Sequence, residues 1–389
     1  MKHRRSTRVL LLTVVVALFV LSSRAWSQQV VVGTTADGSL YEFVVPNDWN
    51  GWLVVYAHGI TDPQAPIALP SRNSDFGAFR DALVAEGYAV ASSSWSENGY
   101  ALKDGVQRIH QLNGLFTSRV SRPTHIVLVG KSLGGGVVIK LAEQFPSEYS
   151  GALAMCGTVG GGTPEVKYLA DVRILFDHFF PGVVPGNIFN TPTLDFSPGS
   201  PTFDAVLQAV EVGFVLPTQP TLQFASTARL PATNPTELVT SALEGVGFSV
   251  RFSDDLIDRT HGHIPYDNTG VVYTGSADDT QLNQTVERFT STPDAANYVA
   301  RYYDPTGHLQ IPVLTLHNLL DPVAPYFHEQ IYKSLVAQAG ASNLLVQQSV
   351  THYDHCTFSL QEKLNAFNGL AAWVSNPANK PAGGDVTLP

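Results

Sequence analysis

The chain has 389 residues, of which 44% are hydrophobic and 14% charged, and its formal net charge is −10. Its 32 Gly and 25 Pro exclude collagen-like and low-complexity chains, and its 2 Cys exclude a disulfide-framework miniprotein or a four-thiolate zinc module. Because a surface of this sign repels phosphate backbones and anionic lipid, we do not expect nucleic-acid binding.

Residues 1–27 are typical of an export signal. A basic head precedes the apolar run Val9–Leu21, which is too short for a retained membrane anchor, and Ala25-Trp26-Ser27 has the small residues that a signal peptidase recognises. The removed segment contains five basic residues and no acids, so the mature chain would have 18 basic and 33 acidic residues and a formal charge of −15. We therefore expect a secreted or periplasmic protein with no stable membrane insertion.

The first part of the mature chain, residues 28–159, predicts a mostly parallel sheet. Short β-branched and aromatic runs open it, and strands then alternate with segments of helical spacing. This order predicts an α/β fold with helices on both faces of the sheet. The expected strands are 30–32, 40–45, 52–57, 88–93, 125–129 and 151–155, and the expected helices are 76–86, 102–116 and 134–145.

The alternation stops over residues 160–308, which is much longer than an ordinary connection. This stretch contains helical patterns and enough Phe, Leu and Val to form a core, so we interpret it as an inserted, mainly helical cap rather than a disordered linker. The sheet pattern resumes after it, and we assign 309–375 to the same core as 28–159. The Pro- and Gly-rich residues 376–389 are expected to form a flexible tail.

The segment Gly130-Lys131-Ser132-Leu133-Gly134 carries the strongest chemical signal. It is a G-x-S-x-G motif between an apolar strand and a helix, the setting in which this motif presents a nucleophilic serine. The glycines allow the sharp turn, and the helix start directs backbone N–H groups at negative charge that develops beside the serine. We therefore predict that Ser132 is the nucleophile.

A nucleophilic serine needs a base, and the base needs an acid to orient it. Asp321 and His355 each follow one of the last two predicted strands, and the carboxyl ends of parallel strands converge in one crevice. We predict that His355 is the base and Asp321 the acid. His352 remains an alternative base; Asp354 and Glu329 are weaker alternatives for the acid, and we expect them to be an exposed loop residue and a surface helix residue.

The oxyanion hole should be formed by two backbone N–H groups. One belongs to Leu133, the residue after the nucleophile, and the other to Ile60, which follows the flexible glycine of a strand-end loop. Further residues of these loops are expected to border the substrate, although His58 would mainly support its loop. The expected substrate-binding residues are His58, Gly59, Lys131 and Trp95.

Together these segments resemble secreted α/β-hydrolase-fold serine esterases over residues 30–160 and 310–375. The pair His355-Cys356 is similar to the tannase and feruloyl esterase family, in which a disulfide joins cysteines adjacent to the serine and to the histidine. Here Lys131 precedes Ser132, so the resemblance implies that Cys156 is the partner of Cys356. Two free buried cysteines remain the alternative.

These features predict a serine hydrolase that cleaves small or polymeric carboxylic esters through an acyl-enzyme, without a cofactor. A serine peptidase of the prolyl oligopeptidase type would usually add repeated propeller strands, which the sequence lacks. Polyester depolymerase, acyltransferase and a binding protein on an inactive scaffold remain alternatives. His261 and His263 lie close in sequence to several aspartates, but we do not expect a metal site because no third ligand is fixed by spacing.

Overall fold

A nine-stranded sheet forms the centre of the computed structural model, which describes residues 28–190 and 194–388. The strand order is β1-β2-β4-β3-β5-β6-β7-β8-β9. β2 pairs antiparallel with both β1 and β4, and all other neighbouring strands pair parallel. The strands are β1 (Gln28–Thr34), β2 (Leu40–Pro46), β3 (Trp52–Ala57), β4 (Ala89–Ser93), β5 (His125–Lys131), β6 (Gly151–Met155), β7 (Val313–Leu320), β8 (Leu345–Tyr353) and β9 (Gly384–Asp385).

Helices cover both faces of this sheet because its central strands are apolar on both sides. α2 (Leu102–Arg119), α3 (Leu133–Gln144) and α10 (Phe327–Gln338) pack into one core, whereas α1 (Asp75–Ala85) and α11 (Leu360–Ser375) pack into the other. Short 3₁₀ turns at Ser342–Leu344 and Pro377–Asn379 complete this part. The arrangement is an α/β-hydrolase fold, as predicted from the alternation of strands and helices.

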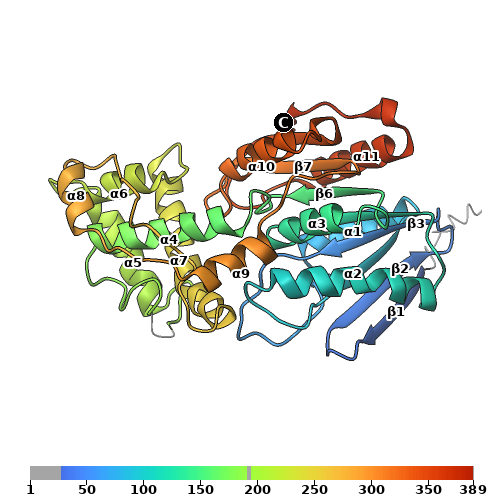
Figure 1. Cartoon of the computed structure of the whole chain (residues 1–389), viewed down its shortest axis with the longest axis horizontal. Helices are drawn as coiled ribbons and strands as arrows, with labels where there is room; N and C mark the ends of the chain where they lie inside the picture. The colour runs from blue at the N-terminus through green and yellow to red at the C-terminus, as the bar shows by residue number, and fades with distance from the viewer. Residues whose placement is uncertain (1–27, 191–193, 389) are drawn as a thin grey trace, which may run out of the picture.

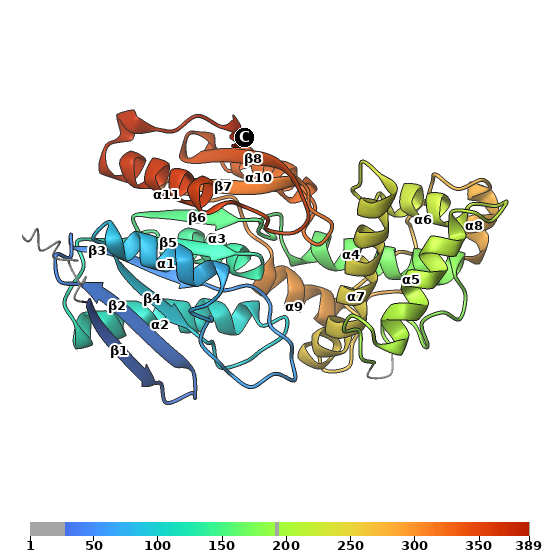
Figure 2. The same cartoon turned by 180° about the vertical axis from the view of Figure 1, so that it is seen from behind.

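Residues between β6 and β7 form a helical lobe beyond one end of the sheet (Figures 1 and 2). Its described residues, 160–190 and 194–308, add no strand to the sheet. They pack around Phe176, Phe180 and Phe224, whose rings contact one another, and these residues are continuous with the core on one face of the sheet. The helices are α4 (Gly162–Phe179), α5 (Pro201–Gly213), α6 (Pro220–Ala228), α7 (Pro235–Arg259), α8 (Asp279–Thr285) and α9 (Pro293–Tyr303).

The last residues of the chain are bound to the sheet, so the expectation of a flexible tail was wrong for the described part of 376–388. β9 pairs with β8, the Val386 N–H donates to Ser349 O (2.9 Å), and the Leu388 N–H donates to Glu362 Oε1 (3.0 Å). The open edge of β8 offers backbone groups that a short strand can satisfy, whatever its Pro and Gly content.

The expected signal peptide, residues 1–27, lies outside the described residues. Within the part of the chain that the structure describes, no helix is long and apolar enough to cross a membrane.

Candidate active site

Ser132 sits in the tight turn between β5 and α3, where its backbone is left-handed (φ 57°, ψ −127°). A side chain at Gly130 would overlap the backbone of Gly134, and one at Gly134 would overlap the backbone of Ala57. Only glycine fits at these two positions, which is the physical reason for the spacing of the motif. Such a strained turn raises the serine above the end of the sheet.

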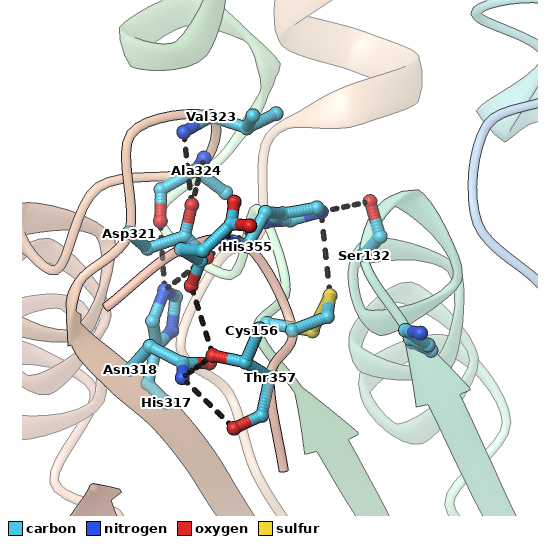
Figure 3. The surroundings of a disulfide bond; sticks show 12 residues. Ser132, Cys156, His317, Asn318, Asp321, Val323, Ala324, His355 and Thr357 are labelled. Carbon is cyan, nitrogen blue, oxygen red and sulfur yellow. Dashed lines mark hydrogen bonds and ion pairs between the residues drawn. A yellow bond between two sulfur atoms is a disulfide. The ribbon is translucent and has the colours of Figure 1, made fainter. Parts of the chain in front are cut away.

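Ser132, His355 and Asp321 are joined by two hydrogen bonds (Figure 3). The Oγ atom of Ser132 lies 2.8 Å from Nε2 of His355, and Nδ1 of His355 lies 2.7 Å from Oδ2 of Asp321. Asp321 is fully buried, and its Oδ1 accepts hydrogen bonds from the N–H groups of Val323 and Ala324, each 2.9 Å long. The acceptor at Nδ1 keeps that nitrogen protonated and leaves Nε2 free to take the serine proton.

The alternative residues make other contacts. His352 Nε2 lies 2.9 Å from Glu362 Oε1, whereas His355 is the histidine beside Ser132. The side chain of Asp354 accepts a hydrogen bond from the His355 N–H (2.6 Å) and thus supports the loop. The geometry therefore favours His355 as the base and Asp321 as the acid.

Glu329 is buried, so the expectation of a surface helix acid was wrong. It lies on α10 and bonds to Thr315 Oγ1 (2.6 Å) and His317 Nδ1 (3.0 Å). The other nitrogen of His317 donates to Ala324 O (2.7 Å) and lies 3.8 Å from Asp321 Oδ2. Burial disfavours a charge on His317, but the hydrogen bond and charge of Glu329, together with Asp321, outweigh it and raise the pKa of His317.

A second buried acid lies close to this group. Glu165, at the start of α4, accepts a hydrogen bond from His328 Nε2 (2.8 Å), while His328 Nδ1 accepts one from the Gly160 N–H (3.1 Å). Burial and then the charge of Asp321 raise the pKa of Glu165 to about 8. Burial and then the charge of His317 lower the pKa of His328 to about 3. Sequence reasoning identified neither residue, since no local pattern marks them.

The glycine loop after β3 lies directly against the serine. A Cβ atom on Gly59 would stand 3.0 Å from Ser132 Cβ and 3.5 Å from its Oγ, so a side chain there would crowd Ser132. Ile60 follows this glycine, and Leu133 begins α3, whose first N–H groups have no partner within the helix. The positions of these two residues suit the predicted oxyanion donors.

The other expected substrate-binding residues lie deeper or point elsewhere. Trp95 is only 1% exposed, and its ring stacks on the buried His58 with 4.1 Å between the ring centroids, so it packs against the loop after β3. Burial lowers the pKa of His58, which keeps its ring neutral. The ammonium of Lys131 lies 3.4 Å from Asp75 at the start of α1. Sequence alone could not give these side-chain directions.

A disulfide joins Cys156, directly after β6, to Cys356, directly after His355 (Figure 3). The two Cα atoms are 5.3 Å apart although 200 residues separate them in the chain. Among the described residues, the one group of potential metal ligands that lie close together is Cys156, His355 and Cys356, and its two sulfurs are used by the disulfide. His261 and His263 belong to no such group there.

Comparisons with known proteins find distant likenesses. No family model matches the chain. An o-phthalyl amidase of Xanthobacter agilis is 23% identical over 392 residues, which cover 85% of this chain and 84% of that protein. Feruloyl esterase B from Aspergillus oryzae is 14% identical with a TM-score of 0.49, covering 91% of this chain and 80% of the other. An esterase from Pyrococcus furiosus is 13% identical with a TM-score of 0.44, covering 94% of each chain.

Proposed function

We propose that the protein is an exported serine hydrolase that cleaves carboxylic esters through an acyl-enzyme. The observation that carries the proposal is the pair of hydrogen bonds, 2.8 and 2.7 Å long, that joins Ser132 to His355 and His355 to Asp321. The left-handed turn at Ser132 and the close approach of Gly59 support it, because both serve a nucleophile beside an oxyanion hole. The basic and apolar residues 1–27 and the disulfide support export.

In the proposed reaction, Ser132 Oγ attacks the ester carbonyl while its proton moves to Nε2 of His355. Asp321 stabilises the imidazolium, and the N–H groups of Leu133 and Ile60 bind the oxyanion. His355 then gives the proton to the departing alcohol as the C–O bond breaks. Water attacks the acyl-enzyme with His355 again as base, and the acid leaves as Ser132 regains its proton.

The test is the initial hydrolysis rate of purified mature protein on p-nitrophenyl esters from acetate to palmitate and on methyl ferulate. We expect Ser132→Ala to lose at least about 10⁴-fold in kcat, and Ser118→Ala, which changes an exposed serine of α2, to lose nothing. Labelling by a fluorophosphonate, located at Ser132 by mass spectrometry, gives a readout that does not depend on the substrate. Ester turnover that survives in Ser132→Ala would overturn the mechanism.

Amide hydrolysis is the second candidate, because a relative that matches 85% of the chain is named as an amidase. The same serine, base and acid can attack an amide, and His355 would then protonate the departing amine. An Ala-Pro anilide and a benzanilide in the same panel separate the two reactions. Anilide turnover above ester turnover, lost in Ser132→Ala, would replace esterase by amidase or peptidase.

A further inference from the structure

The N-terminal end of helix α7 contacts the strand end that leads into the proposed base, His355. Tyr353 ends β8, two residues before His355, and its hydroxyl donates to Glu237 O (2.6 Å). The same hydroxyl lies 2.9 Å from Ser241 Oγ. The first two turns of α7 are therefore fixed to the strand end that leads into His355.

The C-terminal end of α7 contacts a different loop of the core, the one after β4. Asp255 accepts a hydrogen bond from the Tyr100 N–H (2.6 Å), and Arg259 donates to Asn98 O (2.6 Å). This loop begins at Trp95, whose ring stacks on His58 beside the glycine that touches Ser132. α7 thus bridges the base side and the oxyanion side of the proposed site.

One face of α7 carries both of these contacts. In a helix, residues three, four and seven positions apart lie on one face. Ser241, which contacts Tyr353, and Asp255, which contacts Tyr100, are related by such steps and so share a face. Glu244, Phe248 and Arg251 occupy the intervening positions of the same face, and Arg251 is exposed. Between Ser241 and Asp255 this face therefore carries a carboxylate, an aromatic ring and an exposed guanidinium.

Glu244 is half-buried, and the charges of His355 and Asp321 reach it. Burial and then the charge of Asp354 raise the pKa of Glu244; Arg251 and His355 act in the opposite direction, and Asp321 raises it further. Within the described residues the carboxylate has no hydrogen-bond or ion-pair partner. The other acids of this region, in contrast, are all hydrogen-bonded; they are Glu165, Asp321, Glu329 and Asp354.

A half-buried carboxylate without a partner is costly, and a ligand that donates a hydrogen bond to it removes that cost. A carboxylate on the ligand would instead add repulsion in a region that already holds several acids. Phe248 contacts Phe252 at 5.2 Å, and both line a small apolar pocket of about 40 Å³ between α4 and α7. The same face of α7 therefore offers an acceptor and, one turn further on, an apolar surface.

We propose that Glu244 is a specificity-determining residue of this site: it accepts a hydrogen bond from an ammonium or hydroxyl group of the substrate and excludes substrates with a carboxylate at that place. The preferred substrate then combines an apolar body against Phe248 with a donor group toward Glu244. The inference deepens the proposed esterase function and rests on it.

Two series of aromatic esters test this. Methyl benzoates place a meta substituent on the acyl side, and phenyl acetates place it on the alcohol side; each series has ammoniomethyl, hydroxymethyl, hydrogen and carboxylate members. In wild-type protein we expect kcat/KM in one series to fall from the donor-bearing members to the carboxylate member. Glu244→Gln should reduce the gap between ammonium and carboxylate by on the order of 10-fold, since one nearby charge is lost.

Glu211→Gln is the matched control, because it removes the same charge from an exposed position of α5 in the same cap. It should keep the wild-type order, whereas Glu244→Lys should reverse it. An unchanged order in Glu244→Gln would overturn the inference and leave the esterase proposal standing, provided that turnover still needs Ser132. If neither ester turnover nor fluorophosphonate labelling at Ser132 occurs in wild-type protein, both proposals fail.

Discussion

The sulfur of Cys356 lies 3.3 Å from Nε2 of His355, the same ring nitrogen that faces Ser132. Through the disulfide to Cys156, the loop of the proposed base is tied to the end of β6, which pairs with the strand that leads to Ser132. Cys156, Asp354 and Cys356 have positive φ angles of 44°, 86° and 60°. Such conformations are unfavourable for residues with a side chain, so the surrounding structure must hold them in place.

Removing the disulfide should therefore lower both stability and activity. For the double variant Cys156→Ala and Cys356→Ala, we expect the free energy of unfolding to fall by about 2–5 kcal/mol, the range found when native disulfides are removed. The ester kcat should fall at a temperature at which the variant is still folded, because the His355 loop is less restrained. Urea unfolding followed by circular dichroism, with rates measured on the same samples, checks both. Unchanged rates would show that the remaining contacts of the loop suffice to place His355.

Gly59→Ala should reduce activity without unfolding the protein. The new Cβ would stand 3.0 Å from Ser132 Cβ, so either the nucleophile or the Ile60 backbone must shift. Displacing one oxyanion donor costs about 10²-fold or more in kcat. Steady-state ester kinetics and a thermal unfolding curve give the two readouts.

Gly114→Ala is the control for that substitution. Gly114 is exposed within α2 and has open space where a Cβ would lie, so alanine should preserve activity and stabilise the helix by up to about 1 kcal/mol. If Gly59→Ala behaved in the same way, the Gly59 loop would not take part in the reaction.

The parts of the site that were predictable from the sequence are those determined by local backbone geometry. A side chain at Gly130 would overlap the backbone of Gly134, and one at Gly134 would overlap that of Ala57, so both glycines appear as a recognisable five-residue motif. Asp321 and His355 could be predicted because each follows a strand, and parallel strands bring their carboxyl ends together. The fold class followed from the same alternation of strands and helices.

The parts that were missed depend on how distant elements pack. Glu329 lies on a helix as expected, but its burial against Thr315 and His317 depends on how α10 packs on β7. Glu165 meets His328 across 163 positions of the chain. Trp95 follows its strand as predicted, but the direction of its ring is determined by packing against His58 and Gly105.

Glu165 should make the protein less stable as the pH rises. Its pKa is raised from 4.5 to about 8 in the folded protein, so between these values the folded state holds a proton that the unfolded state has released. Stability therefore falls with increasing pH through this window, and the full penalty is present above about pH 8. His328, whose pKa is lowered from 6.5 to about 3, is neutral in both the folded and the unfolded state in the upper part of this window, so it does not mask the effect there.

Glu165→Gln removes this titration and keeps an oxygen that can accept the hydrogen bond of His328 Nε2. The difference in the free energy of unfolding between the variant and wild type should grow in favour of the variant by about 1.4 kcal/mol from pH 7 to pH 9. Over this interval the folded wild type holds half a proton on average, which corresponds to about one full pH unit of linkage. Urea unfolding at pH 7, 8 and 9 measures this difference, with Glu211→Gln as the exposed control. If wild type and Glu165→Gln gave parallel stability curves over this range, Glu165 would be ionised in the folded protein at pH 7. The buried acids around Asp321 would then need more compensating positive charge than His317 provides.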